Sequence, residues 1–456
     1  MGTVGISFGS ATSGTGFDVA STVTAILAVE TAVETPWKTQ LTVLQAQDTV
    51  LTTIGTDLST LTTKLQALTD FTGVLAQKDG SSSNTNILTL TGATSAASAG
   101  SHTITVNNLA QTSSNYSDTI TNSADVLSGT LTLQVGSGTA TTITIDSSNN
   151  TLATLATAIN GASLGVTASV ITDTAGSRLS LVSNTNGTAG QLTVTSAVSD
   201  TTTGSSVGFS VGSTGKNASL IVDGITLSTA SNTVSNAIPG VTFQLLASDT
   251  GTSVQVQIAN DDSAVMSAVN DVVTAYNAVI TDINTQEGKD SSGNPEPLFG
   301  SSTLALLQSQ LGQALLGGSA SGTINNIGQL GLSVNNDGTL TLSTDTLQSA
   351  LDNNYADVTG FLQNSGSFGS NFNKVLNSLG SQAPSGEIYL ALQANSSEET
   401  DLSSSITKQD ARIATDKTNL TTELNTANEI LQSIPSQLDE INQLYSAISG
   451  YNKSSN

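Results

Sequence analysis

The stretch WKTQLTVLQAQDTVLTTIGTDLSTLTTKLQAL, residues 37–68, decides the fold of this chain. Its apolar side chains recur at alternating steps of three and four residues, with one polar exception at Asp48: Trp37, Leu41, Leu44, Leu51, Ile54, Leu58, Leu61, Leu65 and Leu68. This period is typical of the seam of a coiled coil. An ordinary amphipathic helix inside a globular domain is the alternative, but the strict spacing over such a length favours the coiled coil.

A second helical segment precedes this seam. Its apolar residues Val19, Val23, Ile26 and Val33 lie on one side, and Asp18 stands where a carboxylate can cap the first free amides. Pro36 separates the two segments and is expected to bend or interrupt the helix there.

The far end of the chain carries a matching seam. Its members are Leu402, Ile406, Ile413, Leu420, Leu424, Ala427, Leu431, Ile434, Leu438, Ile441, Tyr445 and Ile448. Pro435 lies inside this repeat and is expected to kink it. Each seam needs a helical partner, and antiparallel pairing of the two ends satisfies both while the middle of the chain loops out. Pairing between subunits satisfies them equally, so the sequence leaves that choice open.

The middle of the chain changes to a period of two, between about Asn84 and Asn260. Segments that alternate apolar residues with Thr, Ser or Gln predict half-buried antiparallel strands at 86–91, 102–106, 130–135, 142–145, 166–171, 178–182, 219–222, 241–245 and 253–258. A helix is expected over 151–160, and helical period returns at Asp261 and again at Thr303. Residues 335–338, NNDG, predict a tight hairpin.

These patterns predict an α+β multidomain fold. The N- and C-terminal segments are expected to form an antiparallel helical coiled coil or bundle, with β-rich head domains inserted between them. The expected parts are an N-terminal helical leg segment (1–36), a coiled-coil helix (37–83), a β-rich head domain (84–121 with 206–260), an inserted α+β module (122–205), a helical bundle with a β-hairpin (261–394) and a C-terminal leg helix (395–456).

Composition argues against several functions. The 456 residues carry 11 Lys and Arg against 35 Asp and Glu, a net charge of −24, which opposes binding to nucleic acid. The absence of Cys excludes disulfides, thiolate metal sites and cysteine nucleophiles. The most apolar stretch near the start, residues 19–33, is too short and too polar to span a bilayer, so no membrane insertion is expected.

No catalytic or metal-binding set stands out either. The single histidine, His102, lies on an alternating strand with no deducible Ser or Asp partner, so a structural role is expected for it. The loop 335–338 lacks the acidic series and distal Glu of a calcium-binding EF-hand. Residues 14–16 and 136–138, GTG and GSG, lack the spacing and the Lys of a phosphate loop. We therefore expect no enzyme, cofactor or metal.

Several motifs carry a resemblance to a known family. They are residues 14–19 (GTGFDV, with Phe17 where the family usually has Leu), 104–111 (ITVNNLAQ), 142–160 with 165–169 and 177–181, 222–226 (VDGIT) with 231–235 and 238–241, and 268–277. In this order the chain resembles the hook-associated protein 2 family of flagellar filament caps. The region 142–181 is similar to the insertion module shared among axial flagellar proteins, whereas 222–277 separates caps from junction proteins and flagellins.

The resemblance implies a non-enzymatic assembly factor at the extracellular distal tip of the bacterial flagellum. It implies export through the flagellar type III apparatus with an export chaperone, a pentamer-like homo-oligomeric ring, and promotion of flagellin insertion. The helical legs would contact flagellin and the β domains would form the head plate. Two alternatives stay open: a hook–filament junction or filament subunit of the same axial family, and a surface adhesin.

The surface expected to bind flagellin or another copy of the chain is apolar and comes from both ends. Its residues are Phe17, Val19, Val23 and Ile26 at the front and Leu431, Ile434, Leu438, Ile441 and Tyr445 at the back. For each of them the alternative is that the side chain only holds the coiled coil of the monomer.

Overall fold

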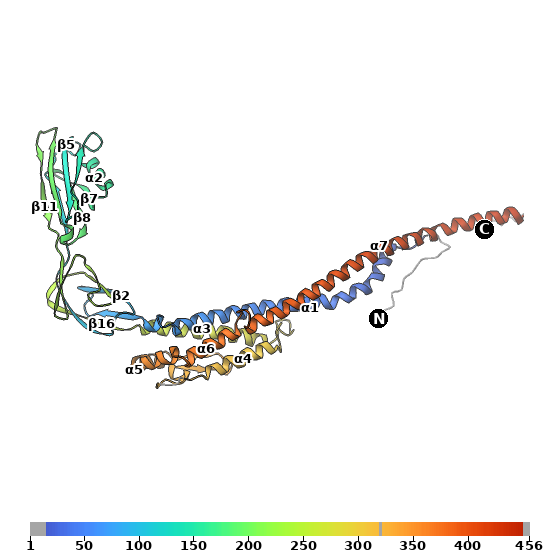
Figure 1. Cartoon of the computed structure of the whole chain (residues 1–456). Coiled ribbons are helices and arrows are strands. Elements are labelled where there is room, and N and C mark those ends of the chain that lie inside the picture. Colours follow the sequence, from blue (N-terminus) through green and yellow to red (C-terminus); the bar gives the residue numbers. More distant parts are fainter. Residues whose placement is uncertain (1–14, 319–321, 450–456) are drawn as a thin grey trace. The chain divides into compact units, whose positions relative to one another are not determined.

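The computed structural model describes residues 15–318 and 322–449. The chain divides into two compact units, residues 70–265 and the remainder from both ends of the sequence (Figure 1). Gly14, the first residue of the motif at 14–19, lies outside the described residues.

The unit built from the two chain ends is mainly helical. It contains α1 (Val19–Thr69), most of α3 (Asp262–Gln286), α4 (Ser302–Leu315), η3 (Ile327–Leu330), β17 (Leu332–Val334), β18 (Leu340–Leu342), α5 (Thr344–Gln363), α6 (Phe368–Leu379) and α7 (Glu387–Ser449). Helices α1 and α7 lie side by side and run antiparallel (Figure 1). The coiled-coil prediction is therefore met by pairing within one chain.

Helix α1 begins where the sequence predicts. Asp18 Oδ1 accepts a hydrogen bond of 3.2 Å from the Ser21 amide, which satisfies one of the free amides of the first turn. The sequence predicts a bend or an interruption at Pro36; the interruption is wrong, because α1 continues through this residue, and α7 likewise continues through Pro435. A proline removes one backbone hydrogen bond, and a helix held on both sides of that position tolerates the loss.

The end of α1 differs from the expected coiled-coil helix 37–83. The helix stops at Thr69, one residue after the last seam residue Leu68, and a 3-10 turn, η1 (Val74–Ala76), leads into strand β1 (Lys78–Ser82). The next seam position after Leu68 is the polar Thr72, and Gly73, which disfavours a helix, follows it.

The core of the helical unit is formed by the leucine half of α1 and by aromatic residues. The α1 residues Leu51, Ile54, Leu58, Leu61, Leu65 and Leu68 are at most 2% exposed. Phe361 and Phe368 stack with ring centroids 4.9 Å apart, and Tyr276 and Phe372 are also fully buried. Burial of each large apolar side chain contributes roughly 1.5–3 kcal/mol, so this cluster anchors α1 firmly.

The other unit contains two antiparallel β assemblies, each with its own core. In the first, sheet β1-β16-β3-β12-β13 faces sheet β14-β15-β2 around Leu88, Ile104, Leu220 and Phe243. Its further strands are β2 (Leu88–Ala93), β3 (Gly100–Asn108), β12 (Ala218–Val222), β13 (Ile225–Thr229), β14 (Thr233–Ser235), β15 (Val241–Leu245) and β16 (Asp249–Asn260).

The second assembly combines sheets β10-β9-β5-β6 and β11-β4-β8-β7 with helix α2 around Leu131, Leu155 and Leu179. Its elements are β4 (Thr112–Ser117), β5 (Leu127–Val135), β6 (Thr141–Ile145), α2 (Leu152–Gly161), β7 (Val166–Asp173), β8 (Gly176–Asn186), η2 (Thr188–Gly190), β9 (Leu192–Asp200), β10 (Ser206–Val207) and β11 (Phe209–Ser213). Thr151 caps α2 with a reciprocal capping box.

All nine predicted strand segments coincide with observed strands, and the hairpin predicted at 335–338 joins β17 to β18. The boundary expected at residues 121/122 and 205/206 is shifted, however. Strands β4 and β11 pair with each other, and β4 also pairs with β8, so both belong to the second assembly. The chain passes between the two assemblies at the bridge between Gln111 and Lys216.

Candidate functional site

The pairing of α1 with α7 positions the front residues of the expected binding surface. The Phe17 amide donates a hydrogen bond of 2.8 Å to Asn428 Oδ1, and Asn395 Nδ2 donates one of 2.7 Å to Asp48 Oδ1. Gly55 of α1 approaches Ile388 near the start of α7. The two helices therefore run antiparallel, and the start of α1 lies beside Asn428.

The front residues lie against α7. Val23 is 2% exposed, whereas Phe17, Val19 and Ile26 are half-buried. A groove of about 610 Å³ opens between the helices here, lined by Phe17, Asp18, Val19, Ala20, Val23 and Thr24 and by Lys417, Thr421, Asn425 and Asn428. Val23 therefore holds the helix pair of the monomer, and Phe17 and Val19 border an open groove.

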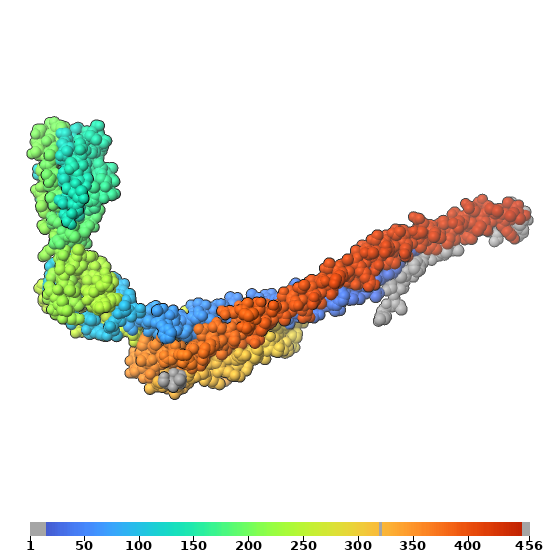
Figure 2. Space-filling view, viewed as in Figure 1, coloured from blue at the N-terminus to red at the C-terminus, as the bar shows by residue number. Residues whose placement is uncertain are grey.

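The back residues divide along α7. Leu431 and Ile434 are half-buried, but Leu438, Ile441 and Tyr445 are 42%, 62% and 68% exposed. Helix α1 begins at Val19, beside Asn428, so no described residue of α1 reaches the last turns of α7. Figure 2 shows the end of α7, in red, continuing past the blue start of α1.

Sequence reasoning missed part of this exposed face. Ile430 and Leu444, which are absent from the predicted seam, are 58% and 63% exposed and lie on the same stretch of α7 as the seam residue Ile448, which is 81% exposed. Ile430 and Leu444 each directly precede a seam residue, so they widen the stripe beyond the two positions per heptad of a two-stranded coiled coil. Counting three apolar positions per heptad would have found them. We call Ile430, Leu438, Ile441, Leu444, Tyr445 and Ile448 the α7 stripe.

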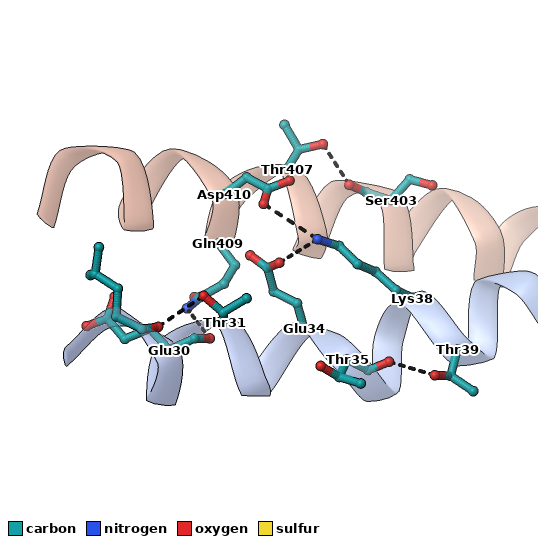
Figure 3. Close-up of polar contacts among 11 residues, drawn as sticks. Glu30, Thr31, Glu34, Thr35, Lys38, Thr39, Ser403, Thr407, Gln409 and Asp410 are labelled. Atoms are coloured by element: carbon teal, nitrogen blue, oxygen red, sulfur yellow. Dashed lines mark hydrogen bonds and ion pairs between the residues drawn. The ribbon is translucent and has the colours of Figure 1, made fainter. Parts of the chain in front are cut away.

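Polar and charged groups line the facing sides of α1 and α7 between Glu30 and Thr39 (Figure 3). Lys38 Nζ lies 2.6 Å from Glu34 Oε2 and 3.7 Å from Asp410 Oδ1 of α7. Hydrogen bonding to Glu34, and then the attraction of Asp410, raises the pKa of Lys38, so this ammonium group stays protonated. Gln409 Nε2 donates to the Glu30 carbonyl oxygen across the pair, at 3.4 Å.

His102 has a carboxylate partner that the sequence did not reveal. Its Nδ1 lies 2.7 Å from Asp223 Oδ2, and the Thr103 amide donates to Asp223 Oδ1 at 2.8 Å. Hydrogen bonds with His102 and then Thr103 hold the pKa of Asp223 below its ordinary value. Asp223 forms the turn between β12 and β13 with φ of 49°, so the contacts fasten this turn to β3.

Across residues 15–318 and 322–449, no three acidic or histidine side chains converge in a way that would hold a metal ion. Within the same ranges, every helix is too short or too polar to cross a membrane.

Comparison with known proteins bears on the same helices. The family description "Flagellar hook-associated protein 2 C-terminus" matches residues 215–447, just over half of the chain. The chain belongs to the flagellar hook-associated protein 2 family. The N-terminal description of that family matches residues 15–113, and "Flagellin hook IN motif" matches residues 130–185.

Individual members of the hook-associated protein 2 family agree with this assignment. The chain is 32% identical over 315 residues to the B-type flagellar hook-associated protein 2 of Pseudomonas aeruginosa, covering 63% of this chain and 66% of the relative. It is 31% identical over 294 residues to the flagellar hook-associated protein 2 of Escherichia coli K12, covering 59% and 63%. The matches thus span just under two thirds of the length of each relative.

The fold also agrees with a solved structure. The D1-D2-D3 domains of the flagellar cap protein FliD from Escherichia coli superpose with a TM-score of 0.59 at 27% identity, over 76% of this chain and 99% of that chain. The predicted architecture, helical ends with inserted β domains, is therefore confirmed, as is the resemblance to the hook-associated protein 2 family.

Proposed function

We propose that this protein caps the distal tip of a bacterial flagellar filament and promotes the insertion of exported flagellin. Family membership and the fold shared with a flagellar cap protein support the proposal. The observation that carries it is the α7 stripe, a run of large apolar side chains that continues the α1–α7 seam beyond the start of α1. Such a stripe is typical of a helix that packs against helices of another molecule.

The exposure of the α7 stripe in the monomer indicates how the stripe would bind a partner helix. Its apolar side chains are 42–81% exposed in the monomer, so burial by a partner helix adds part of the roughly 1.5–3 kcal/mol that full burial of a large apolar side chain contributes. Packing of this kind has no single fixed geometry, so a cap can release one helix and engage the next as the filament grows. Several apolar contacts of moderate strength suit such repeated exchange better than a single strong interaction.

The remaining parts of the proposal concern assembly. Residues from the two chain ends, 1–69 and 266–456, act as the leg that contacts flagellin and sister subunits, and residues 70–265 act as the head. Several copies form a pentamer-like ring at the extracellular filament tip. The flagellar type III export apparatus and an export chaperone deliver the chain. No catalytic activity, cofactor or metal is required for this function.

The proposal is tested by imaging the full chain with purified filaments in negative stain. We expect plates or rings at one filament end. Ile441→Asp removes an apolar side chain of the stripe and adds a charge, so it should abolish end binding. Asn442→Asp adds the same charge at the adjacent exposed position and should leave end binding intact.

Two outcomes contradict the proposal. Open helical polymers of the purified chain would assign it to a junction or filament subunit, because heterologous contacts that do not close form filaments. Monomers that ignore filament ends, with or without the substitution, would exclude a cap role for this chain.

A further inference from the structure

Helix α1 has two chemically different parts. In residues 44–68, which we call the leucine segment, α1 buries Leu51, Ile54, Leu58, Leu61, Leu65 and Leu68. The same stretch also contacts α5 and α6, and Leu65 and Leu68 share an apolar cluster with Val273 and Phe372. The leucine segment is therefore held from several sides.

The polar segment comprises residues 19–40 of α1 and the facing residues 398–428 of α7. Only Val23 and Leu27 of its α1 part are buried apolar side chains. Polar contacts join the two helices here: Gln40 with Glu398, Lys38 with Asp410, Gln409 with the Glu30 carbonyl, and Asn428 with the Phe17 amide. Fully buried apolar side chains of α1 therefore hold this segment less firmly than they hold the leucine segment.

Glu34 lies in the middle of the polar segment and is only 1% exposed. Its Oε2 atom pairs with Lys38, but its Oε1 atom is buried with no hydrogen-bond partner among the described residues. Glu30 Oε2 and Glu399 Oε1 are likewise buried without a hydrogen-bond partner among the described residues. A buried carboxylate oxygen without a donor has lost its water without replacement, which destabilises the closed pair.

The charges around Glu34 add to this destabilisation. Glu30 and Lys38 lie one turn away on α1, and Asp410 faces them from α7 (Figure 3). The nearby Arg412 of α7 pairs instead with Asp416 of its own helix, at 3.6 Å. Lys38 thus lies between two carboxylates, those of Glu34 and Asp410, and its side chain is half exposed, at 51%. Because Lys38 is partly exposed, solvent screens its charge and weakens its attraction for the carboxylates.

We propose that the two helices of the polar segment separate and re-associate while the leucine segment stays packed in the helical unit. Opening returns water to Glu30, Glu34 and Glu399 and loses the burial of few apolar side chains, so the two states lie close in free energy. In the open state, residues 19–40 of α1 leave α7, and the seam residues Ile413 and Leu420 of α7 become free to pack against another helix. This inference concerns the monomer and does not depend on the cap function.

Two substitutions act in opposite directions on this equilibrium. Glu34→Leu removes the buried carboxylate and fills the seam with an apolar side chain, while Lys38 remains solvated beside Asp410, so it favours the closed state. Lys38→Met leaves Glu34 buried without its partner, so it favours the open state. Thr39→Ala, an exposed position on the same turn, is the matched control.

Amide hydrogen exchange of the full chain, read by mass spectrometry, tests the proposal. We expect the amides of 19–40 and of 400–428 to exchange at least about tenfold faster than those of 44–68. Glu34→Leu should slow both stretches about tenfold, Lys38→Met should speed both, and Thr39→Ala should change neither. Fraying of the α1 end alone would leave the middle of α7 protected and would overturn the proposal, as would equal protection of both segments.

A second measurement gives the distance directly. The chain has no Cys, so spin labels at Ala32→Cys and Ala411→Cys, exposed positions on the two helices of the polar segment, are unique. We expect a short and a long distance population, of which Glu34→Leu retains the short one. A single short population in the parent chain would overturn the proposal.

Discussion

Asn395 of α7 donates a hydrogen bond of 2.7 Å to the Asp48 carboxylate of α1. Asp48 is the one polar residue in the heptad seam of α1, so the structure places an amide opposite the single position where the apolar repeat fails. A polar pair in an otherwise apolar seam disfavours shifted registers, because any shift leaves the carboxylate without its donor. The pair therefore fixes how α1 and α7 align.

The first prediction concerns this pair. Asp48→Ala and Asn395→Ala should each destabilise the helical unit by about 1–2 kcal/mol, because each leaves a half-buried polar group unpaired. The double variant should recover part of the loss, with a coupling of about 0.5–3 kcal/mol. Urea denaturation followed by helical circular dichroism measures the cycle. Gln45→Ala with Gln393→Ala, two exposed positions, should show no coupling.

The leucine segment should be the most sensitive part of α1 to truncation. Leu58 is 0% exposed, so Leu58→Ala should lower the free energy of unfolding of the helical unit by about 2–5 kcal/mol. The exposed Thr56→Ala is its control and should remain within about 0.5 kcal/mol of the parent chain. Similar values for the two variants, measured by urea denaturation, would contradict the described packing.

A leucine of the α7 stripe should behave in the opposite way. Leu438 is 42% exposed, so Leu438→Ala should leave the stability of the monomer within about 0.5 kcal/mol of the parent. The same change should weaken binding to filament ends, because the lost side chain is buried only in the assembly. Thermal denaturation and filament co-sedimentation, run on one preparation, separate the two effects. A large loss of monomer stability would assign Leu438 to the monomer core.

Acid should weaken the contact between the β12–β13 turn and β3. The pKa of Asp223 lies below its ordinary value of 3.8, chiefly through its hydrogen bond with His102. A depressed carboxyl pKa stabilises the fold above the unfolded value, and this contribution is lost as pH falls through the folded value. Asp223→Asn, which also tolerates the positive φ, should therefore speed amide exchange in β3 at pH 6 and have a shrinking effect below about pH 4.

A carboxyl pair in the helical unit should respond to pH with the opposite sign. The pKa of Asp282 on α3 lies above its ordinary value because of burial and, next, its hydrogen bond with Asp57 of α1. A raised carboxyl pKa stabilises the fold below the unfolded value, and this contribution is lost as pH rises through the folded value. Asp282→Asn should thus raise the midpoint of thermal unfolding at pH 7 and not at pH 3.5. The exposed Asp271, which pairs with Lys64, supplies the control Asp271→Asn, which should not raise it.

Much of the architecture was predictable because it is encoded locally. The alternating steps of three and four residues predicted α1 and α7, and the period of two predicted nine strands. Asp18 predicted the start of α1 through short-range capping, and residues 335–338 predicted their hairpin. In each case the residues that carry the signal lie within a few positions of one another.

Strand β4 shows why other elements escaped prediction. Its buried face consists of Ser113, Asn115 and Ser117, so the sequence TSSNYS shows no apolar alternation. Ser117 Oγ accepts a hydrogen bond of 2.8 Å from the Leu179 amide, a partner 62 positions away. A polar residue becomes a core residue only through such a distant partner, which periodicity does not reveal.

The candidate surface was likewise predictable only in part from the sequence. Periodicity identifies which faces of α1 and α7 must be buried, since a heptad repeat specifies an apolar stripe whatever covers it. The pairing of the two helices within one chain, the start of α1 beside Asn428, and the resulting separation of buried Val23 from exposed Ile441 follow from long-range contacts. An amino-acid pattern specifies the need for a partner; the identity of that partner, and the point where it ends, depend on how distant segments fit in space.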